Sequence, residues 1–388
     1  MPPTFYLHDA HQNCWLDFGQ PKTLLQTFCL SDIQPALQAI EKHTQTGGYA
    51  AGFLAYEAAS AFDSALQTHP LEDFPLLWFG LFDHAPQHIQ FPSPAATLPA
   101  LHWQTDTDLP NYRRAFRHIK HAIGRGETYQ INYTFRLNAQ IPLTAPANPL
   151  HSPFARLLHA QPTPYAACLS DGAHWSIFSA SPECFFTRHA DVITCRPMKG
   201  TAARHPEPRH DQQRARALQR SAKNRAENIM IVDMLRNDLG QIAQTGSVHV
   251  PTLFEIEAYP TVWQMTTTVQ ARSRAPLPEL LNALFPCASI TGAPKVSACR
   301  IIRRHETTPR RIYTGSIGFI CPDGRAQFNV AIRTLLAHQN NARFTQAQYG
   351  IGSGIVWDSR PAAEYAECLS KAAALRALSS TAHIPQIA

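Results

Sequence analysis

The spacing of hydrophobic and polar residues predicts alternating strands and helices in the first part of the chain. Residues 47–57 and 76–82 are apolar runs bounded by glycine or proline, which is typical of buried strands. In residues 111–123 the large apolar side chains recur three or four positions apart, which predicts an amphipathic helix. Residues 129–137 alternate instead and predict a strand with Gln130 on its polar face.

The rest of the chain continues this mixture. Residues 166–178 and 184–194 have the branched and aromatic composition of strands. Residues 313–320 and 328–335 flank the turn sequence Pro322-Asp323-Gly324 and predict a hairpin. The pattern as a whole predicts an α/β protein, with antiparallel pairing at least at this hairpin.

Composition narrows the class of protein. The 388 residues are 44% hydrophobic and 16% charged, as in a globular chain with a large core. Four prolines between residues 91 and 110 predict either a domain boundary or a long surface loop there. We expect an N-terminal α/β region (1–110) packed onto the core, a main domain (111–380) and a tail (381–388).

The expected cellular location rests on three sequence features that we do not find. No apolar run approaches the ~20 residues that span a bilayer, and no signal peptide is recognisable. Nine cysteines, an odd number without a Cys-x-x-Cys pair, favour reduced thiols. We therefore expect a cytoplasmic protein with no membrane partner.

The net charge of +6 favours an anionic ligand and leaves nucleic-acid binding as an alternative. The densest basic segment, residues 204–225, contains seven lysines and arginines, but also two acidic residues and no aromatic residues that would stack on bases. We expect a solvated helix face there and no nucleic-acid partner.

Lys199 is a candidate nucleophile. A strand-like run ends at Thr194, and Pro197 then breaks regular structure, so we expect Lys199 on a turn. Its neighbour Gly200 allows close approach of the backbone to a ligand. A lysine attacks as a neutral amine when burial or a cationic neighbour lowers its pKa. A solvated surface lysine is the ordinary alternative for a lone Lys-Gly-Thr.

Glu227 is a candidate metal ligand on a predicted helix that ends at Gly240. It shares a helix face with apolar residues, and a carboxylate on a buried face needs a partner. Pairing with Arg220 or Lys223 is the structural alternative.

A second predicted helix begins at Pro361 and places Glu364, Glu367 and Lys371 within a ~60° arc. The alternative for Glu367 and Lys371 is an ordinary ion pair on a helix surface. The glycines of Gly350-Ile351-Gly352-Ser353-Gly354 lie just before it and allow backbone N–H groups to approach a ligand. Carboxylates alone, from two helices, suit Mg²⁺ bound jointly with an anionic substrate.

In combination, these residues resemble the chorismate-utilising enzymes, and most closely their aminodeoxychorismate synthase component I group. The resemblance covers roughly residues 111–378, and its motifs stand in the family's order. They are Tyr129-Gln130-Ile131-Asn132, Ser181-Pro182-Glu183, Pro197-Met198-Lys199-Gly200-Thr201, Glu227-Asn228-Ile229-Met230-Ile231-Val232-Asp233, Ile290-Thr291-Gly292-Ala293-Pro294-Lys295, Ala331-Ile332-Arg333-Thr334, and the glycine segment with Glu364, Glu367 and Lys371.

The resemblance implies a fold of the α+β type, in which two large, mainly antiparallel sheets pack together with helices outside. It also implies Mg²⁺ held by Glu227 and Glu367 with help from Glu364, and a chorismate carboxylate gripped by Tyr313 and Arg333. Lys371 or Lys295 would stabilise developing charge. The further substrate contacts that it implies come from Gln130, Gly200, Thr201, Gly352 and Gly354.

Lys199 and Glu183 are the catalytic residues that the resemblance implies. Lysine at this place separates aminodeoxychorismate synthases from relatives that have alanine. Lys199 would attack ring C2 while Glu183 protonates the leaving C4 hydroxyl, and ammonia would then add at C4. Gln130 supports ammonia as the nucleophile, because family members that use water have a basic lysine there.

The implied partners are a glutamine amidotransferase subunit in a heterodimer, which supplies ammonia, and a separate aminodeoxychorismate lyase that acts on the product in 4-aminobenzoate and folate biosynthesis. The leading alternative function is anthranilate synthase component I, which forms anthranilate and pyruvate from chorismate. A catalytically inactive scaffold is a third hypothesis, which the complete set of candidate residues argues against.

Overall fold

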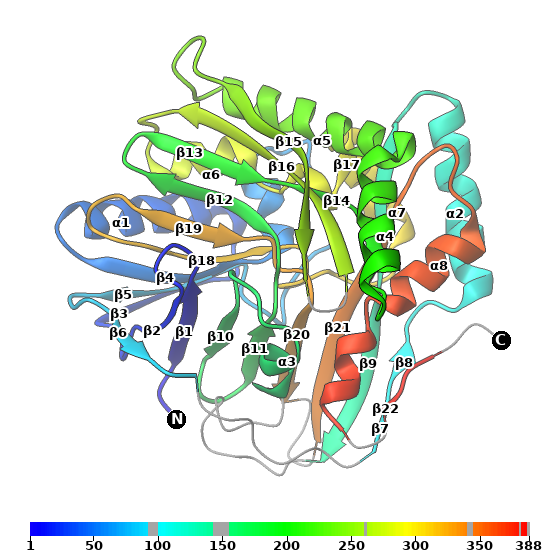
Figure 1. Cartoon of the computed structure of the whole chain (residues 1–388). Coiled ribbons are helices and arrows are strands. Elements are labelled where there is room, and N and C mark those ends of the chain that lie inside the picture. Colours follow the sequence, from blue (N-terminus) through cyan, green and yellow to red (C-terminus); the bar gives the residue numbers. More distant parts are fainter. Residues whose placement is uncertain (92–99, 143–154, 260–261, 340–343, 380–381, 386–388) are drawn as a thin grey trace.

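The computed structural model describes residues 1–91, 100–142, 155–259, 262–339, 344–379 and 382–385. Two ten-stranded sheets dominate the fold (Figure 1). The first has the order β17 (Gly292–Ala293), β9 (Gln130–Pro142), β21 (Phe344–Ile355), β20 (Thr334–Gln339), β11 (Trp175–Ser179), β10 (Ala167–Ser170), β1 (Thr4–Asp9), β2 (Cys14–Asp17) and β6 (Gln87–Ile89), with β8 (Gln104–Thr105) beside β9.

The second sheet has the order β14 (Met198–Ala203), β16 (Val262–Arg272), β13 (Val192–Arg196), β12 (Cys184–His189), β19 (Ala326–Asn329), β18 (Ser316–Ile320), β4 (Tyr49–Leu54), β5 (Leu77–Phe82) and β3 (Thr23–Thr27), with β15 (His249–Ala258) beside β16. All pairings within the two sheets are antiparallel, which confirms the predicted fold class. A separate parallel pair joins β7 (Leu101–His102) to β22 (Ala382–His383).

Helices cover the outer faces of the sheets (Figure 1). The structure contains α1 (Ile33–Gln45), α2 (Leu109–Gly124), α3 (Arg156–Ala160), α4 (Pro208–Arg220), α5 (Ala222–Gly240), α6 (Leu277–Leu284), α7 (Lys295–His305) and α8 (Pro361–Ser370). Helix α5 packs on β14 and β16, whereas α8 packs on β21 and α2. These contacts bring the two carboxylate-bearing helices, α5 and α8, to the ends of the two sheets.

The hydrophobic core has two large clusters because the first sheet is buried on both faces. One cluster joins residues of both sheets, such as Phe5 and Trp78, whose stacked rings have centroids 4.4 Å apart, to α1, α5 and α6. The other joins the opposite face of the first sheet to α2 and α8, with Tyr112 against Tyr365. In the second sheet, β4 and β5 are buried along almost their whole length, with α1 and the first sheet packed against them, which explains why they read as continuous apolar runs rather than as alternating ones.

Strands from residues 4–89 belong to both sheets and pair directly with later strands, β1 with β10 and β4 with β18. The boundary expected at residue 110 and the tail from residue 381 stay predictions of the sequence. Among the described residues no helix has both the length and the apolar character needed to cross a bilayer.

Two local predictions were wrong. Lys199 lies within strand β14 and not on a turn, because the chain resumes pairing with β16 directly after Pro197, with an irregular register between Met198 and Thr201. The predicted hairpin is confirmed for β18 and β19, but its second segment does not continue as one strand. After Asn329 the chain leaves this sheet and re-enters the other as β20, so residues 330–333 form a crossover.

Candidate active site

A pocket of about 1060 Å³, open to solvent, lies where the two sheets meet α5 and α8. It is lined by twelve of the thirteen site residues predicted from the sequence: Glu183, Lys199, Gly200, Thr201, Glu227, Tyr313, Arg333, Gly352, Gly354, Glu364, Glu367 and Lys371. Residues up to 188 positions apart in the sequence (183 to 371) therefore line the same pocket. Their individual roles stay predictions.

Lys199 reaches the pocket from β14, the edge strand of the second sheet. Its Nζ donates a 3.0 Å hydrogen bond to the carbonyl oxygen of Ser289. Burial lowers the pKa of Lys199 from its usual value, although the carboxylates of Glu227 and Glu183 act in the opposite direction. A larger fraction of this amine is therefore neutral at a given pH than for a surface lysine.

The bend of β14 beside Lys199 requires glycine. Gly200 has φ +90°, a left-handed conformation that residues with a Cβ rarely adopt. A Cβ there would also lie 3.1 Å from Cβ of Asn224 on α5. The backbone of β14 and the first turn of α5 can thus approach closely, with Lys199 and Glu227 facing the same pocket.

Glu183 is almost fully buried, with 3% of its surface exposed, in the segment between β11 and β12. Burial raises its pKa above the usual value, and this effect outweighs the hydrogen bond from Ser289 and the charge of Lys199, which both lower it. The Ser289 hydroxyl donates to Glu183 Oε1 over 2.6 Å. Glu183 is therefore suited to hold a proton and donate it.

Gln130 is the one predicted residue that does not line the pocket. It lies on β9, next to Gly354. A Cβ atom added to Gly354 would be 3.3 Å from Gln130 Nε2 and 3.4 Å from Lys199 Nζ, so the glycine leaves both side chains room beside it. Gln130 is fully buried, and neither its Nε2 nor its Oε1 atom has a hydrogen-bond partner among the described residues. An unpaired buried amide costs free energy, so this arrangement favours a small polar ligand beside it.

The three candidate metal ligands face the pocket from two helices. Burial raises the pKa of Glu227. The charges of Lys199 and Lys223 lower it, whereas the carboxylates of Glu364 and Glu367 raise it, and the net shift is upward. Glu367 differs: burial alone would raise its pKa, but the ammonium of Lys371, 2.8 Å away, outweighs this and lowers it. The structural alternative for Glu227 also has support, since Lys223 Nζ is 3.8 Å from its carboxylate.

These carboxylates fit a divalent cation chemically, because a cation would remove the repulsion that raises the pKa of Glu227. Their oxygen atoms do not, however, converge as a closed group. Among the described residues, the single set of three ligand atoms within 4.8 Å of one another is elsewhere, at His205, Glu207 and His210.

Arg333 and Tyr313 also line the pocket. Within the described part of the chain, the Arg333 guanidinium forms no ion pair with a carboxylate, so its charge is available to an anionic ligand. Its backbone has φ +50°, which is uncommon for a residue other than glycine and is found at functional sites. The crossover at residues 330–333 thus presents Arg333 at the junction of the sheets.

Two lysines were considered for stabilising charge, and the structure separates them. Lys371 Nζ lines the pocket and donates to the Gly352 carbonyl oxygen over 2.7 Å. Lys295 does not line it and pairs with Asp238 at 2.8 Å. Lys295 is therefore not placed to contact a ligand in this pocket.

Sequence reasoning missed Ser289, whose hydroxyl binds Glu183 and whose carbonyl accepts from Lys199. Asn132 and Tyr349 also line the pocket without having been selected. Asn132 is two residues from Gln130 on the polar face of β9, so the alternation of that strand was the available signal. Ser289 lies in a short 3₁₀ turn with no periodicity that would have selected it.

The chain resembles a family of known proteins along most of its length. A family model described as chorismate binding enzyme matches residues 6–377. The chain belongs to this family. The match includes both sheets and every candidate residue of the pocket.

The similar proteins include aminodeoxychorismate synthases and an anthranilate synthase component. The chain is 40% identical over 273 residues to aminodeoxychorismate synthase component 1 of Salmonella typhimurium, and this match covers 69% of the chain and 57% of the relative. It is 39% identical over 297 residues to aminodeoxychorismate synthase of Streptomyces pristinaespiralis, 39% of whose length is covered. Anthranilate synthase component 1 of Streptomyces coelicolor is 31% identical over 407 residues, 92% of the chain and 77% of the relative. The chain thus covers less than two thirds of the aminodeoxychorismate synthases named here.

Solved structures of the family share the fold. A putative 2,3-dihydroxybenzoate-specific isochorismate synthase from Bacillus anthracis superimposes with a TM-score of 0.77 at 19% identity, covering 97% of this chain and 96% of that one. Anthranilate synthase component I from Streptococcus pneumoniae gives 0.75 at 23% identity, with 97% and 91% covered. At these identities the likeness establishes the two-sheet architecture alone.

Proposed function

We propose that this member of the chorismate-binding family aminates chorismate to 4-amino-4-deoxychorismate and retains the enolpyruvyl group. The observation that supports this most directly is a lysine with a lowered pKa, Lys199, joined through Ser289 to a glutamate with a raised pKa, Glu183. A neutral amine and a protonated carboxyl are the forms that nucleophilic attack and leaving-group protonation require. The similarity to aminodeoxychorismate synthases supports the same function.

The proposed chemistry has two substitutions. Lys199 Nζ forms a bond to ring C2, the double bond shifts, and the C4–O bond breaks as Glu183 protonates the departing hydroxyl to water. The new ammonium at C2 returns a proton to the Glu183 carboxylate. Ammonia then forms a bond to C4, the ring double bonds shift back, and the C2–N bond breaks as Glu183 protonates the departing Lys199 nitrogen. The new C4 ammonium returns a proton to the Glu183 carboxylate, and Lys199 leaves as a neutral amine. Overall, ammonia is consumed, the C4 hydroxyl is released as water, and the enzyme is regenerated.

The other pocket residues bind and orient the substrate in this proposal. The unpaired guanidinium of Arg333 and the Tyr313 hydroxyl bind one carboxylate of chorismate, while Lys371 lies near the second. Glu227, Glu364 and Glu367 would hold Mg²⁺, which when bound neutralises the ring carboxylate. The buried, unpaired amide oxygen of Gln130 accepts a hydrogen bond from ammonia beside Lys199.

Ammonia comes from a glutamine amidotransferase subunit in this proposal, because the names of the similar proteins include the term component 1. The product would go to a separate aminodeoxychorismate lyase that forms 4-aminobenzoate for folate synthesis, and the reaction would take place in the cytoplasm.

Product analysis tests the proposal. The purified chain is incubated with chorismate, Mg²⁺ and an ammonium salt at mildly alkaline pH, and the products are separated and identified by mass. We expect a product in which an amine replaces the hydroxyl and which an added lyase converts to 4-aminobenzoate. Anthranilate with pyruvate would instead establish the alternative that the Streptomyces coelicolor relative favours.

A further inference from the structure

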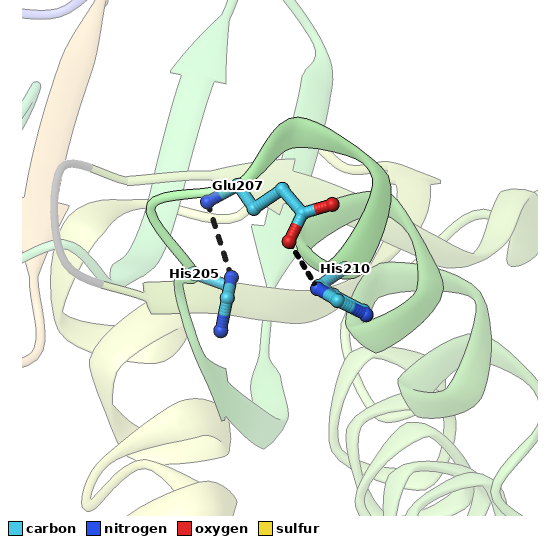
Figure 2. A group of neighbouring side chains, drawn as sticks. All are labelled: His205, Glu207 and His210. Carbon is cyan, nitrogen blue, oxygen red and sulfur yellow. Dashed lines mark hydrogen bonds and ion pairs between the residues drawn. The ribbon is translucent and has the colours of Figure 1, made fainter.

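A second cluster of metal-binding side chains lies outside the pocket, in the connection between β14 and α4. His205, Glu207 and His210 each offer a ligand atom, and these three atoms lie within 4.8 Å of one another. Figure 2 shows the three side chains gathered where this connection enters α4. None of them lines the candidate active site.

Hydrogen bonds hold the cluster in place. The backbone N–H of Glu207 donates to His205 Nδ1 over 3.1 Å, and His210 Nδ1 is 2.7 Å from Glu207 Oε2. The imidazole rings of His205 and His210 have centroids 5.1 Å apart. The three ligand atoms therefore already lie within 4.8 Å of one another, which reduces the entropy lost when a cation binds.

The backbone beneath the cluster is fixed as well. Asp211 on α4 accepts the N–H of His205 over 2.9 Å and pairs with Arg204 at 2.8 Å. Pro206 and Pro208 restrict φ on both sides of Glu207. Because Asp211 pairs with Arg204, that guanidinium is partly neutralised and repels an incoming cation less.

We propose that His205, Glu207 and His210 form a surface site for Zn²⁺ or a chemically similar divalent metal ion, separate from the carboxylates of the pocket. Two imidazole nitrogens and one carboxylate oxygen are a set that Zn²⁺ accepts, with a fourth position open to water. Mg²⁺ prefers oxygen ligands alone and is selected against here. On binding, the metal takes the place of the hydrogen between His210 Nδ1 and Glu207.

The site has a structural consequence. His205 follows the strand that bears Lys199 and Thr201, whereas His210 lies on the first turn of α4. A bound ion therefore ties the end of β14 to α4 across a connection whose side chains are largely exposed; His210 and Glu207 have 53% and 56% of their side-chain surface exposed.

Calorimetric titration with Zn²⁺ in excess Mg²⁺ tests the proposal, since under the proposed function Mg²⁺ would occupy the pocket carboxylates. We expect one equivalent to bind the whole chain, and at least tenfold weaker binding by His210→Ala and by His205→Ala, because even loss of an indirect partner typically costs 10–100-fold. Binding of Co²⁺ should give an absorption band that is lost in the same variants. Circular dichroism verifies that each variant is folded.

His174→Ala is the matched control. His174 pairs with Asp171 at 2.9 Å with the same three-residue spacing as His210 and Glu207, but no third ligand atom from the described residues joins that pair. Wild-type affinity in the control together with loss in the cluster variants supports the site. Unchanged affinity in the folded double variant His205→Ala, His210→Ala, or an equal loss in the control, would overturn it.

Discussion

The Ser289 hydroxyl donates a 2.6 Å hydrogen bond to Glu183 Oε1 in the buried wall of the pocket. The carbonyl oxygen of the same serine accepts the hydrogen bond of Lys199. One residue thus fixes the positions of the proposed acid and the proposed nucleophile, and its removal affects the two groups in different ways.

Replacement of Ser289 by alanine should shift the pH dependence of activity. The hydroxyl stabilises the ionised carboxylate, so its loss raises the pKa of Glu183 further. The proton on Glu183 is then retained to higher pH, and the limb of the kcat/KM profile that reports Glu183 should move up by about one pH unit, since a hydrogen bond to a charged group contributes roughly 1.5 kcal/mol. Ser316→Ala, which removes another buried hydroxyl, should leave the profile unchanged. An unshifted limb in Ser289→Ala would contradict the coupling.

Lys199→Met should abolish turnover without loss of stability. Burial lowers the pKa of Lys199, so the unfolded chain binds the proton more tightly than the folded one below pH 10.5. The wild type should therefore gain stability as the pH rises through the folded pKa toward 10.5, and the variant should lack this gain. Thermal unfolding at pH 7 and pH 9.5 measures it. A Tm well below that of the wild type at pH 7 would show that the lysine is mainly structural.

Glu227→Gln should stabilise the fold in the absence of metal and abolish stabilisation by Mg²⁺. The raised pKa of Glu227 means that its contribution to stability is present below the unfolded pKa and is lost as pH rises through the folded one. At pH 8 without metal, the variant should therefore unfold at a higher temperature than the wild type. Addition of Mg²⁺ should stabilise the wild type alone, because a ligand that binds the folded state raises its Tm.

The control for this prediction is Glu257→Gln, which removes a carboxylate paired with Arg196 outside the pocket. It should keep the Mg²⁺ response of the wild type. An equal Mg²⁺ response in Glu227→Gln would remove this residue from the metal site.

Glu57 should make stability depend on pH near neutrality. It is buried and accepts the backbone N–H groups of Arg310 and Arg311 over 2.6 and 3.0 Å. Burial raises its pKa to about 7, so its contribution is complete below about pH 4.5 and is lost as the pH rises to 7. The difference amounts to at most about 3 kcal/mol. Urea unfolding at pH 5 and pH 8 should show this loss in the wild type and a flatter dependence in Glu57→Gln; parallel curves would exclude the titration of Glu57.

Helical periodicity predicted the site better than strand patterns did. Glu364 and Glu367 lie on α8 and Lys371 caps its C-terminus, so their helical spacing places them on one face wherever the helix packs in the fold. Lys199 was assigned to the wrong local structure because Pro197 and Gly200 indicate a turn, whereas pairing with β16 extends the strand through the left-handed glycine. Tertiary pairing outweighed the local signal.

The local sequence pattern also could not predict that the chain changes sheets after Asn329. Residues 328–335 alternate as a single strand would, and nothing in the alternation says which sheet each part joins. That change creates the crossover with Arg333 at the pocket. The hydrogen bonds of Ser289 depend on side chains 90 and 106 positions away in the sequence, which no local pattern contains.

The most direct test of the account compares products from the wild type and Lys199→Ala, each given chorismate, Mg²⁺ and ammonium. The account predicts that the wild type forms 4-amino-4-deoxychorismate and that the folded variant forms essentially none, because the covalent step needs the Lys199 amine. Turnover by Lys199→Ala at the wild-type rate, or anthranilate with pyruvate from the wild type, would contradict it.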